Sequence, residues 1–79
     1  MNDEEVRLLE YWKSNEGSFV IVDYISNKIL SAAKGRLELV SPTGGVVIRH
    51  LKDPATSWSF NLFEVEIQNS KFSAVKGGG

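Results

Sequence analysis

The chain has 79 residues, a formal net charge of −1 and no cysteine, with 42% hydrophobic and 24% charged residues. These values predict one small globular domain over residues 1–76 with a flexible tail at 77–79, and they exclude disulfide bonds, thiolate metal sites and a cysteine nucleophile. The longest apolar run, residues 19–22, is far shorter than the roughly 20 residues of a membrane-spanning helix. The acidic N-terminus is unlike a signal peptide, so we expect a cytoplasmic protein with no membrane segment.

The first predicted element is a helix over residues 3–14. Asn2 followed by Glu5 is a capping-box pattern, and Leu8, Leu9 and Trp12 form an apolar stripe. A helix of this length is unstable alone, so the stripe is expected to pack on a sheet. Glycine after the helix, at position 17, is suited to the left-handed conformation that ends such an element.

Short strands are predicted after the helix. Residues 18–25 are apolar on both faces, which is typical of a central strand, and Pro42-Thr43-Gly44-Gly45 predicts a hairpin turn. In the strand after that turn, the outward set is either 47, 49 and 51 or 46, 48 and 50, and we favour Arg49 facing solvent. The predicted strands cover about 18–25, 28–33, 36–41, 46–52 and 57–68, with a further segment at 70–75 after a turn at Asn69-Ser70.

The apolar alternation changes phase within residues 57–68. Apolar side chains occupy even positions from Trp58 to Leu62 and odd positions from Phe63 to Ile67. Successive strand side chains point to opposite faces, so a bulge, a short helical turn or a corner is expected near residues 61–63. The predicted fold is mostly β (α+β): an N-terminal helix followed by a small, strongly bent five-stranded antiparallel β-barrel. An open antiparallel sheet with the helix across one face is the alternative.

Few residues have the pattern of a catalytic or metal site. His50 is the only histidine, and a histidine metal site needs a second nitrogen or sulfur ligand. Glu64 and Glu66 alternate with apolar residues, as solvent-facing strand residues do. The glycine-rich turn lacks the lysine of a phosphate-binding loop. We therefore expect no enzyme activity, no metal and no cofactor.

Basic residues concentrate in the middle of the chain. Residues 28–52 contain five basic residues and one acid, for +4, whereas residues 1–17 contain five acids and two basic residues, for −3. This partition suits a polyanion ligand; the other interpretation is acids at a helix N-terminus and lysines on exposed strands. Single-stranded nucleic acid is bound by basic side chains together with stacking planes. The candidate contacts are Arg49, His50, Lys52, Lys34 and Arg36, with Trp58 and Phe60 as either stacking or core residues.

Two short motifs resemble those of the Sm-like family of small RNA-binding barrels, which are SH3-like. Gly35-Arg36-Leu37 resembles the glycine-x-leucine of its first motif, and Val47-Ile48-Arg49-His50 resembles its second motif, with His50 in place of glycine. The resemblance implies a nucleotide contact at Arg49 and ring-forming self-association through edge strands.

Two functions follow as hypotheses. The first is a barrel that binds nucleic acid, with single-stranded RNA as the expected ligand and single-stranded DNA as the alternative, and that forms homo-oligomers through edge strands. The second is a protein-interaction or assembly module, such as a small viral accessory protein, in which the acidic helix and an exposed strand edge contact another protein.

Overall fold

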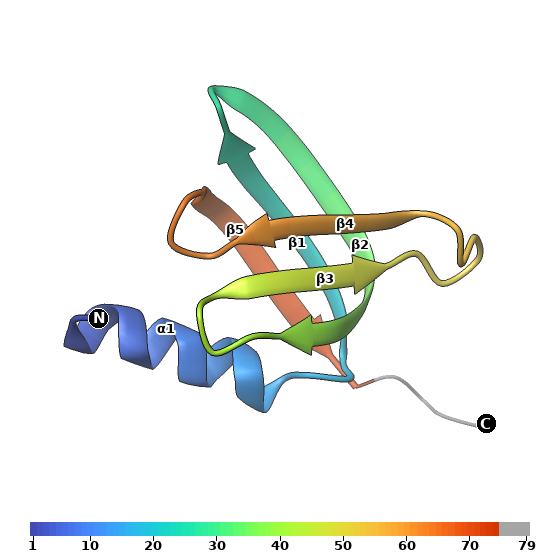
Figure 1. The fold of residues 1–79 in the computed structure, drawn as a ribbon. Coiled ribbons are helices and arrows are strands. Elements are labelled where there is room, and N and C mark those ends of the chain that lie inside the picture. The colour runs from blue at the N-terminus through green and yellow to red at the C-terminus, as the bar shows by residue number, and fades with distance from the viewer. Residues whose placement is uncertain (75–79) are drawn as a thin grey trace.

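The computed structural model of the protein describes residues 1–74. It has one helix, α1 (Asp3–Ser14), followed by five antiparallel strands in the spatial order β4-β3-β2-β1-β5 (Figure 1). The strands are β1 (Phe19–Ser26), β2 (Ile29–Val40), β3 (Gly45–Arg49), β4 (Ser57–Asn61) and β5 (Glu66–Ser73). The predicted helix bounds and the predicted class, a helix followed by a five-stranded antiparallel sheet, are confirmed.

The sheet bends along β2, which belongs to two crossing layers. The first part of β2 pairs with β1 and its last part pairs with β3, and in Figure 1 β3 and β4 cross in front of β1 and β5. A Cβ on Gly35 would lie 2.0 Å from the carbonyl oxygen of Arg49, so only glycine permits this close approach of two backbones. The bend expected at Lys34-Gly35 is present, but the two strands predicted at 28–33 and 36–41 are one continuous strand.

The phase change in residues 57–68 coincides with a turn. The chain leaves β4 at Asn61, whose side-chain oxygen accepts a hydrogen bond from the Phe63 amide at 2.9 Å, and Leu62 is buried. The corner is confirmed, but 57–68 is not one strand: β4 and β5 occupy opposite ends of the strand order.

The predicted turn at Asn69-Ser70 is also wrong. Both residues lie within β5, where an irregularity shifts the register with β1 so that Asp23 faces Asn69 while Tyr24 faces Ile67. A bulge bends a strand without ending it, so polar residues that resemble a turn remain in the sheet. Residue 75 and the predicted tail at 77–79 lie outside the described residues.

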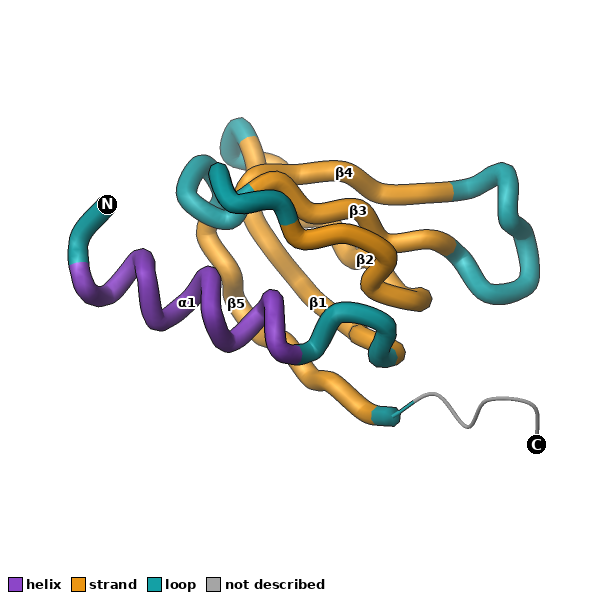
Figure 2. Tube along the Cα trace, turned by 60° about the horizontal axis from the view of Figure 1, so that its bottom comes forward, coloured by secondary structure: helices purple, strands orange, loops and turns teal. Residues whose placement is uncertain are grey.

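The sheet is strongly bent, as predicted, but it is not closed into the predicted barrel. Within residues 1–74, β4 pairs only with β3 and β5 pairs only with β1. The indole of Trp12 lies between these two edges: its ring centroid is 6.1 Å from that of Phe60 on β4 and 4.9 Å from that of Phe72 on β5, both edge-to-face. The helix therefore covers the open side of the sheet, where its axis runs beside β5 (Figure 2).

The core lies between the inner face of the sheet and α1. Trp12 is 1% exposed, and the partly buried Leu8 and Leu9 pack against the same cluster, as the apolar stripe predicts. The inward side chains of the sheet are Val20, Val22, Tyr24, Ala33, Leu37, Val40, Val46 and Ile48. Trp58 and Phe60 are half-buried and pack against this cluster, so they are core residues.

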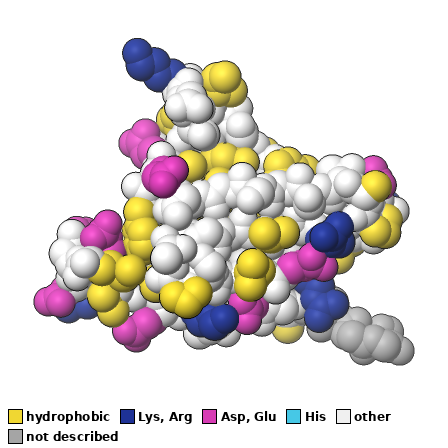
Figure 3. Space-filling model, viewed as in Figure 1, with side chains coloured by type: hydrophobic (Ala, Val, Ile, Leu, Met, Phe, Trp, Pro, Cys, Tyr) yellow, Lys and Arg dark blue, Asp and Glu magenta, His cyan; other side chains and the backbone are white. Residues whose placement is uncertain are grey.

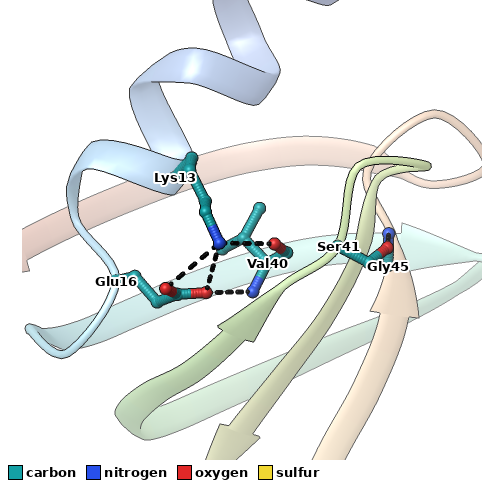
Figure 4. Close-up of polar contacts among 5 residues, drawn as sticks. All are labelled: Lys13, Glu16, Val40, Ser41 and Gly45. Carbon is teal, nitrogen blue, oxygen red and sulfur yellow. Dashed lines mark hydrogen bonds and ion pairs between the residues drawn. The ribbon is translucent and has the colours of Figure 1, made fainter.

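Polar contacts attach the helix to the end of β2. The Asn2–Glu5 capping box is present at the start of α1. Past its end, the Glu16 carboxylate accepts a hydrogen bond from the Val40 amide at 2.7 Å, and Lys13 Nζ lies 3.3 Å from the Val40 carbonyl oxygen and 3.2 Å from Glu16 (Figure 4). The backbone amide and carbonyl of Val40 therefore bond to the Glu16 and Lys13 side chains, where a neighbouring strand would otherwise pair with them. Gly17 adopts a φ of +93°, as expected.

Candidate nucleic-acid interface

The five basic residues predicted as contacts lie at one end of the sheet. Lys34 and Arg36 are on β2, Arg49 ends β3, and His50 and Lys52 begin the loop to β4. Arg36 and Arg49 face each other across adjacent strands. Phe19, Lys34, His50, Leu51 and Lys52 line a shared hollow of about 310 Å³. The structure therefore brings together residues that are separated by up to 18 positions in sequence.

A hydrophobic strip runs between basic side chains on the outer face of the sheet. Phe19 and Ile21 alternate with the buried Val20 and Val22 on β1, so both point away from the core. Phe19 is half-buried, and Ile21 is 37% exposed.

Basic residues flank this strip on both sides. Arg36 is the β2 partner of Phe19, and Ile21 has Lys34 on β2 and Lys71 on β5 as its partners. Neighbouring strands lie about 4.8 Å apart, which places Lys34 and Lys71 roughly 10 Å apart across the strip. We refer to Phe19, Ile21, Lys34, Arg36, Lys52 and Lys71 together as the basic face.

Lys71 is a member of this surface that the sequence did not indicate. The prediction placed residues 70–75 in a separate segment after a turn, so nothing connected Lys71 to Lys34. Its place follows from the register of β5 on β1, which the bulge near Gln68 fixes. The sequence of 66–73 has no regular alternation that would indicate this, because its apolar residues Ile67 and Phe72 lie on opposite phases.

The cations of the basic face have no acidic partner within the described part of the chain. The two ion pairs of residues 1–74 are Lys13–Glu16 and Arg49–Glu38. The nearby Asp53 carboxylate accepts hydrogen bonds from the Thr56 hydroxyl and the Ala55 amide, and these bonds lower the pKa of Asp53 from its usual value. Lys34, Arg36, Lys52 and Lys71 thus remain available to an anion.

Arg49 makes two polar contacts with neighbouring parts of the protein. Its Nε atom lies 2.8 Å from a Glu38 carboxylate oxygen, and its Nη1 atom donates to the carbonyl oxygen of Pro54. Its side chain is 40% exposed, so the predicted outward orientation is correct. With both contacts made, Arg49 joins β2, β3 and the following loop.

His50 organises the loop between β3 and β4. Its Nδ1 atom accepts hydrogen bonds from the backbone amides of Lys52, at 3.1 Å, and Asp53, at 3.0 Å. The imidazole also lies over Trp58, with ring centroids 5.9 Å apart. His50 is therefore a loop-capping residue that positions Lys52.

The face of the molecule formed by β3 and β4 carries side chains of both charges. Figure 3 looks onto β3 and β4 and shows Lys and Arg side chains interleaved with Asp and Glu. Within residues 1–74, no three His, Cys, Asp or Glu side chains lie together as metal ligands would. The basic face carries four cations, and one acid, Asp23, follows Ile21 on the same face of β1.

No protein-family model, curated protein or solved structure matches the chain. Among residues 1–74 there is no helix with the length and hydrophobicity needed to cross a membrane.

Proposed function

We propose that the chain binds single-stranded nucleic acid on the basic face. The observation that carries this proposal is the arrangement of four cations, from β2, β5 and the β3–β4 loop, around the strip of Phe19 and Ile21. None of the four has an ion pair in the described part of the chain. Cations attract a phosphate backbone, and an aromatic ring on the same surface offers a plane to an unstacked base. The Sm-like resemblance favours RNA as the ligand.

We assign the nucleic-acid contacts to a set of residues that differs in part from the set indicated by the sequence. Arg49 is the nucleotide contact that the resemblance implies, but its ion pair with Glu38 and its bond to Pro54 give it a structural role. We therefore assign phosphate contacts to Lys34, Arg36, Lys52 and Lys71, and base stacking to Phe19.

Fluorescence anisotropy with labelled single-stranded RNA and DNA tests this function. Binding that neutralises Z phosphates of a single strand gives a log-log salt slope of about −0.7Z. Contact by the four cations predicts a slope of about −2 to −3, with affinity falling steeply as salt increases. No binding to any of several oligonucleotides at about 50 mM salt would end the proposal.

A second candidate function is assembly through the sheet edges. Both β4 and β5 have an unpaired side within residues 1–74, and an unpaired edge offers its amides and carbonyls to another strand. Pairing β4 of one copy with β5 of the next would extend the sheet into a homo-oligomer; another protein's strand is the alternative partner. Native mass measured with and without oligonucleotide separates self-association from nucleic-acid binding.

The acidic helix provides the test of a protein partner. Asp3, Glu4 and Glu10 are exposed on α1. If the chain is an interaction module, Glu4→Lys with Glu10→Lys will abolish capture of a protein partner, whereas Arg36→Ala will not. The nucleic-acid proposal predicts the reverse dependence for oligonucleotide binding.

A further inference from the structure

A polar hollow lies between the free edge of β4 and the β1–β2 hairpin, away from the basic face. Its volume is about 470 Å³, and its lining includes Tyr24, Ser26, Ser31 and Ser59. Small-ligand sites typically enclose about 300–1,000 Å³. In Figure 1 the hairpin rises above β4. Residues of both elements line this hollow, which we name the seam hollow.

A nearly buried tyrosine presents an unused hydroxyl to the seam hollow. Tyr24 is 6% exposed, and its ring stacks on Phe60 with centroids 4.2 Å apart and planes 28° apart. Its hydroxyl has no hydrogen-bond partner among residues 1–74. Every fully buried side-chain oxygen or nitrogen in that range has a partner, so the Tyr24 hydroxyl is not fully buried. The hydroxyl therefore opens into the hollow that Tyr24 lines, at a position fixed by the stacked rings.

The other residues that line the seam hollow limit the kinds of ligand that it can bind. The serine hydroxyls both donate and accept hydrogen bonds, Asn27 adds an amide and Glu64 adds a carboxylate. Glu64 gives the lining a negative charge, which disfavours a negatively charged ligand. Phe60 and Ile29 offer apolar surface to C–H groups.

We propose that the seam hollow binds a neutral polyhydroxylated ring of the monosaccharide class. Ring hydroxyls bond to Tyr24, the serines and Glu64, while the C–H face of the sugar lies on Phe60. The site uses the inner face at the hairpin end of β1, whereas the basic face uses the outer face at the other end, so the two proposals are independent.

Backbone amide NMR of the full chain tests the site with glucose, galactose, mannose and N-acetylglucosamine at millimolar concentration. At least one sugar is expected to shift the amides of Ser26, Ser31, Ser59 and Glu64 in a saturable way. Tyr24→Phe keeps the stacked ring and loses one hydrogen bond, so it should weaken binding roughly 3- to 10-fold. Tyr11→Phe is the matched control, because Tyr11 is 55% exposed on α1 and does not line the hollow.

Ser31→Ala is a second variant that leaves the aromatic stack untouched, and it should weaken binding in the same direction. Glucose 6-phosphate should bind more weakly than glucose, and Glu64→Gln should reduce that difference. Absence of saturable shifts with all four sugars, equal loss in Tyr24→Phe and Tyr11→Phe, or tighter binding of the phosphate would each overturn the proposal. Native mass recorded on the same samples separates ligand binding from self-association at the adjoining β4 edge.

Discussion

Arg36 and Arg49 face each other across β2 and β3, but within residues 1–74 only Arg49 has an acidic partner. Like charges directly opposite on neighbouring strands repel each other. Glu38 offsets this repulsion for Arg49, whose Nε atom it meets at 2.8 Å, and leaves Arg36 as an uncompensated cation. An anion bound at Arg36 would relieve the remaining repulsion. Under the proposed function, we therefore expect a polyanion to contact Arg36 in preference to Arg49.

Replacing Trp12 with alanine should be strongly destabilising. Trp12 is 1% exposed and contacts both edge strands, so its removal leaves a large cavity between Phe60 and Phe72. We expect a loss of about 3–5 kcal/mol in the free energy of unfolding, measured by urea denaturation. Tyr11→Ala is the control, since Tyr11 is mostly exposed and contacts Phe72 only with one ring edge. Equal losses in the two variants would contradict the role given to Trp12.

Gly35 should not tolerate a side chain. A Cβ there would lie 2.0 Å from a backbone oxygen of Arg49, which cannot move without separating β3 from β2. Gly35→Ala should lower the free energy of unfolding by about 1–3 kcal/mol or more. Gly17→Ala meets no atom within 4 Å and is strained only by its φ of +93°, so its loss should be about 1 kcal/mol. A Gly35→Ala protein as stable as wild type would exclude the close approach.

The turn between β1 and β2 should be improved by glycine. Asn27 and Lys28 have φ values of +52° and +65°, and a non-glycine residue is disfavoured in this region. Asn-Gly is the preferred pair for such a hairpin turn. Lys28→Gly should raise the free energy of unfolding by about 0.5–1 kcal/mol. Lys28→Ala removes the same charge without relieving the backbone, so an equal gain in that variant would refute the explanation.

Acid should weaken the attachment of α1 to β2. The Val40 amide and Lys13 stabilise the charged form of Glu16 and lower its pKa below the ordinary 4.5. A lowered folded-state pKa means that Glu16 stabilises the fold above pH 4.5, and this contribution is lost as the pH falls through the folded-state value. In thermal melts, Glu16→Gln should be less stable than wild type at neutral pH. The difference in stability should shrink as the pH falls below 4.5.

Glu10→Gln is the comparison for this experiment, because Glu10 is an exposed carboxylate on the same helix. At neutral pH it should be less destabilising than Glu16→Gln, because it leaves the bond to the Val40 amide intact. Asp53, whose pKa is also lowered by hydrogen bonds, is unchanged in both variants and so cancels from the comparison. A constant difference between Glu16→Gln and wild type at all pH values would contradict the contact.

Local signals in the sequence were sufficient for the helix and the corner. The Asn2–Glu5 cap and the stripe ending at Trp12 involve neighbours a few residues apart, and the phase change after Asn61 is visible in a short window. Strand partners, in contrast, depend on contacts between distant segments. Two turn-like pairs, at 34–35 and 69–70, lie inside strands because Gly35 permits a bend and a bulge absorbs the extra residue.

The candidate site was predictable only in part for the same reason. Lys34, Arg36, Arg49, His50 and Lys52 were candidates because they belong to one basic stretch of the sequence. Lys71 reaches the surface through the β1–β5 register, and Arg49 is removed from it because Glu38 lies at an irregularity between β2 and β3. Both the position of Lys71 and the Arg49–Glu38 pair depend on how distant strands pair, which a local sequence pattern does not specify.

The most direct measurement compares two double variants that lose the same charge. Lys34→Ala with Arg36→Ala removes two cations from the basic face, whereas Arg7→Ala with Lys28→Ala removes two exposed cations elsewhere. In anisotropy titrations with single-stranded RNA, the first should weaken binding roughly tenfold or more and reduce the salt slope by about 1.4. The second should stay close to wild type. Equal weakening in both variants would show that binding follows net charge alone and would contradict the proposed interface.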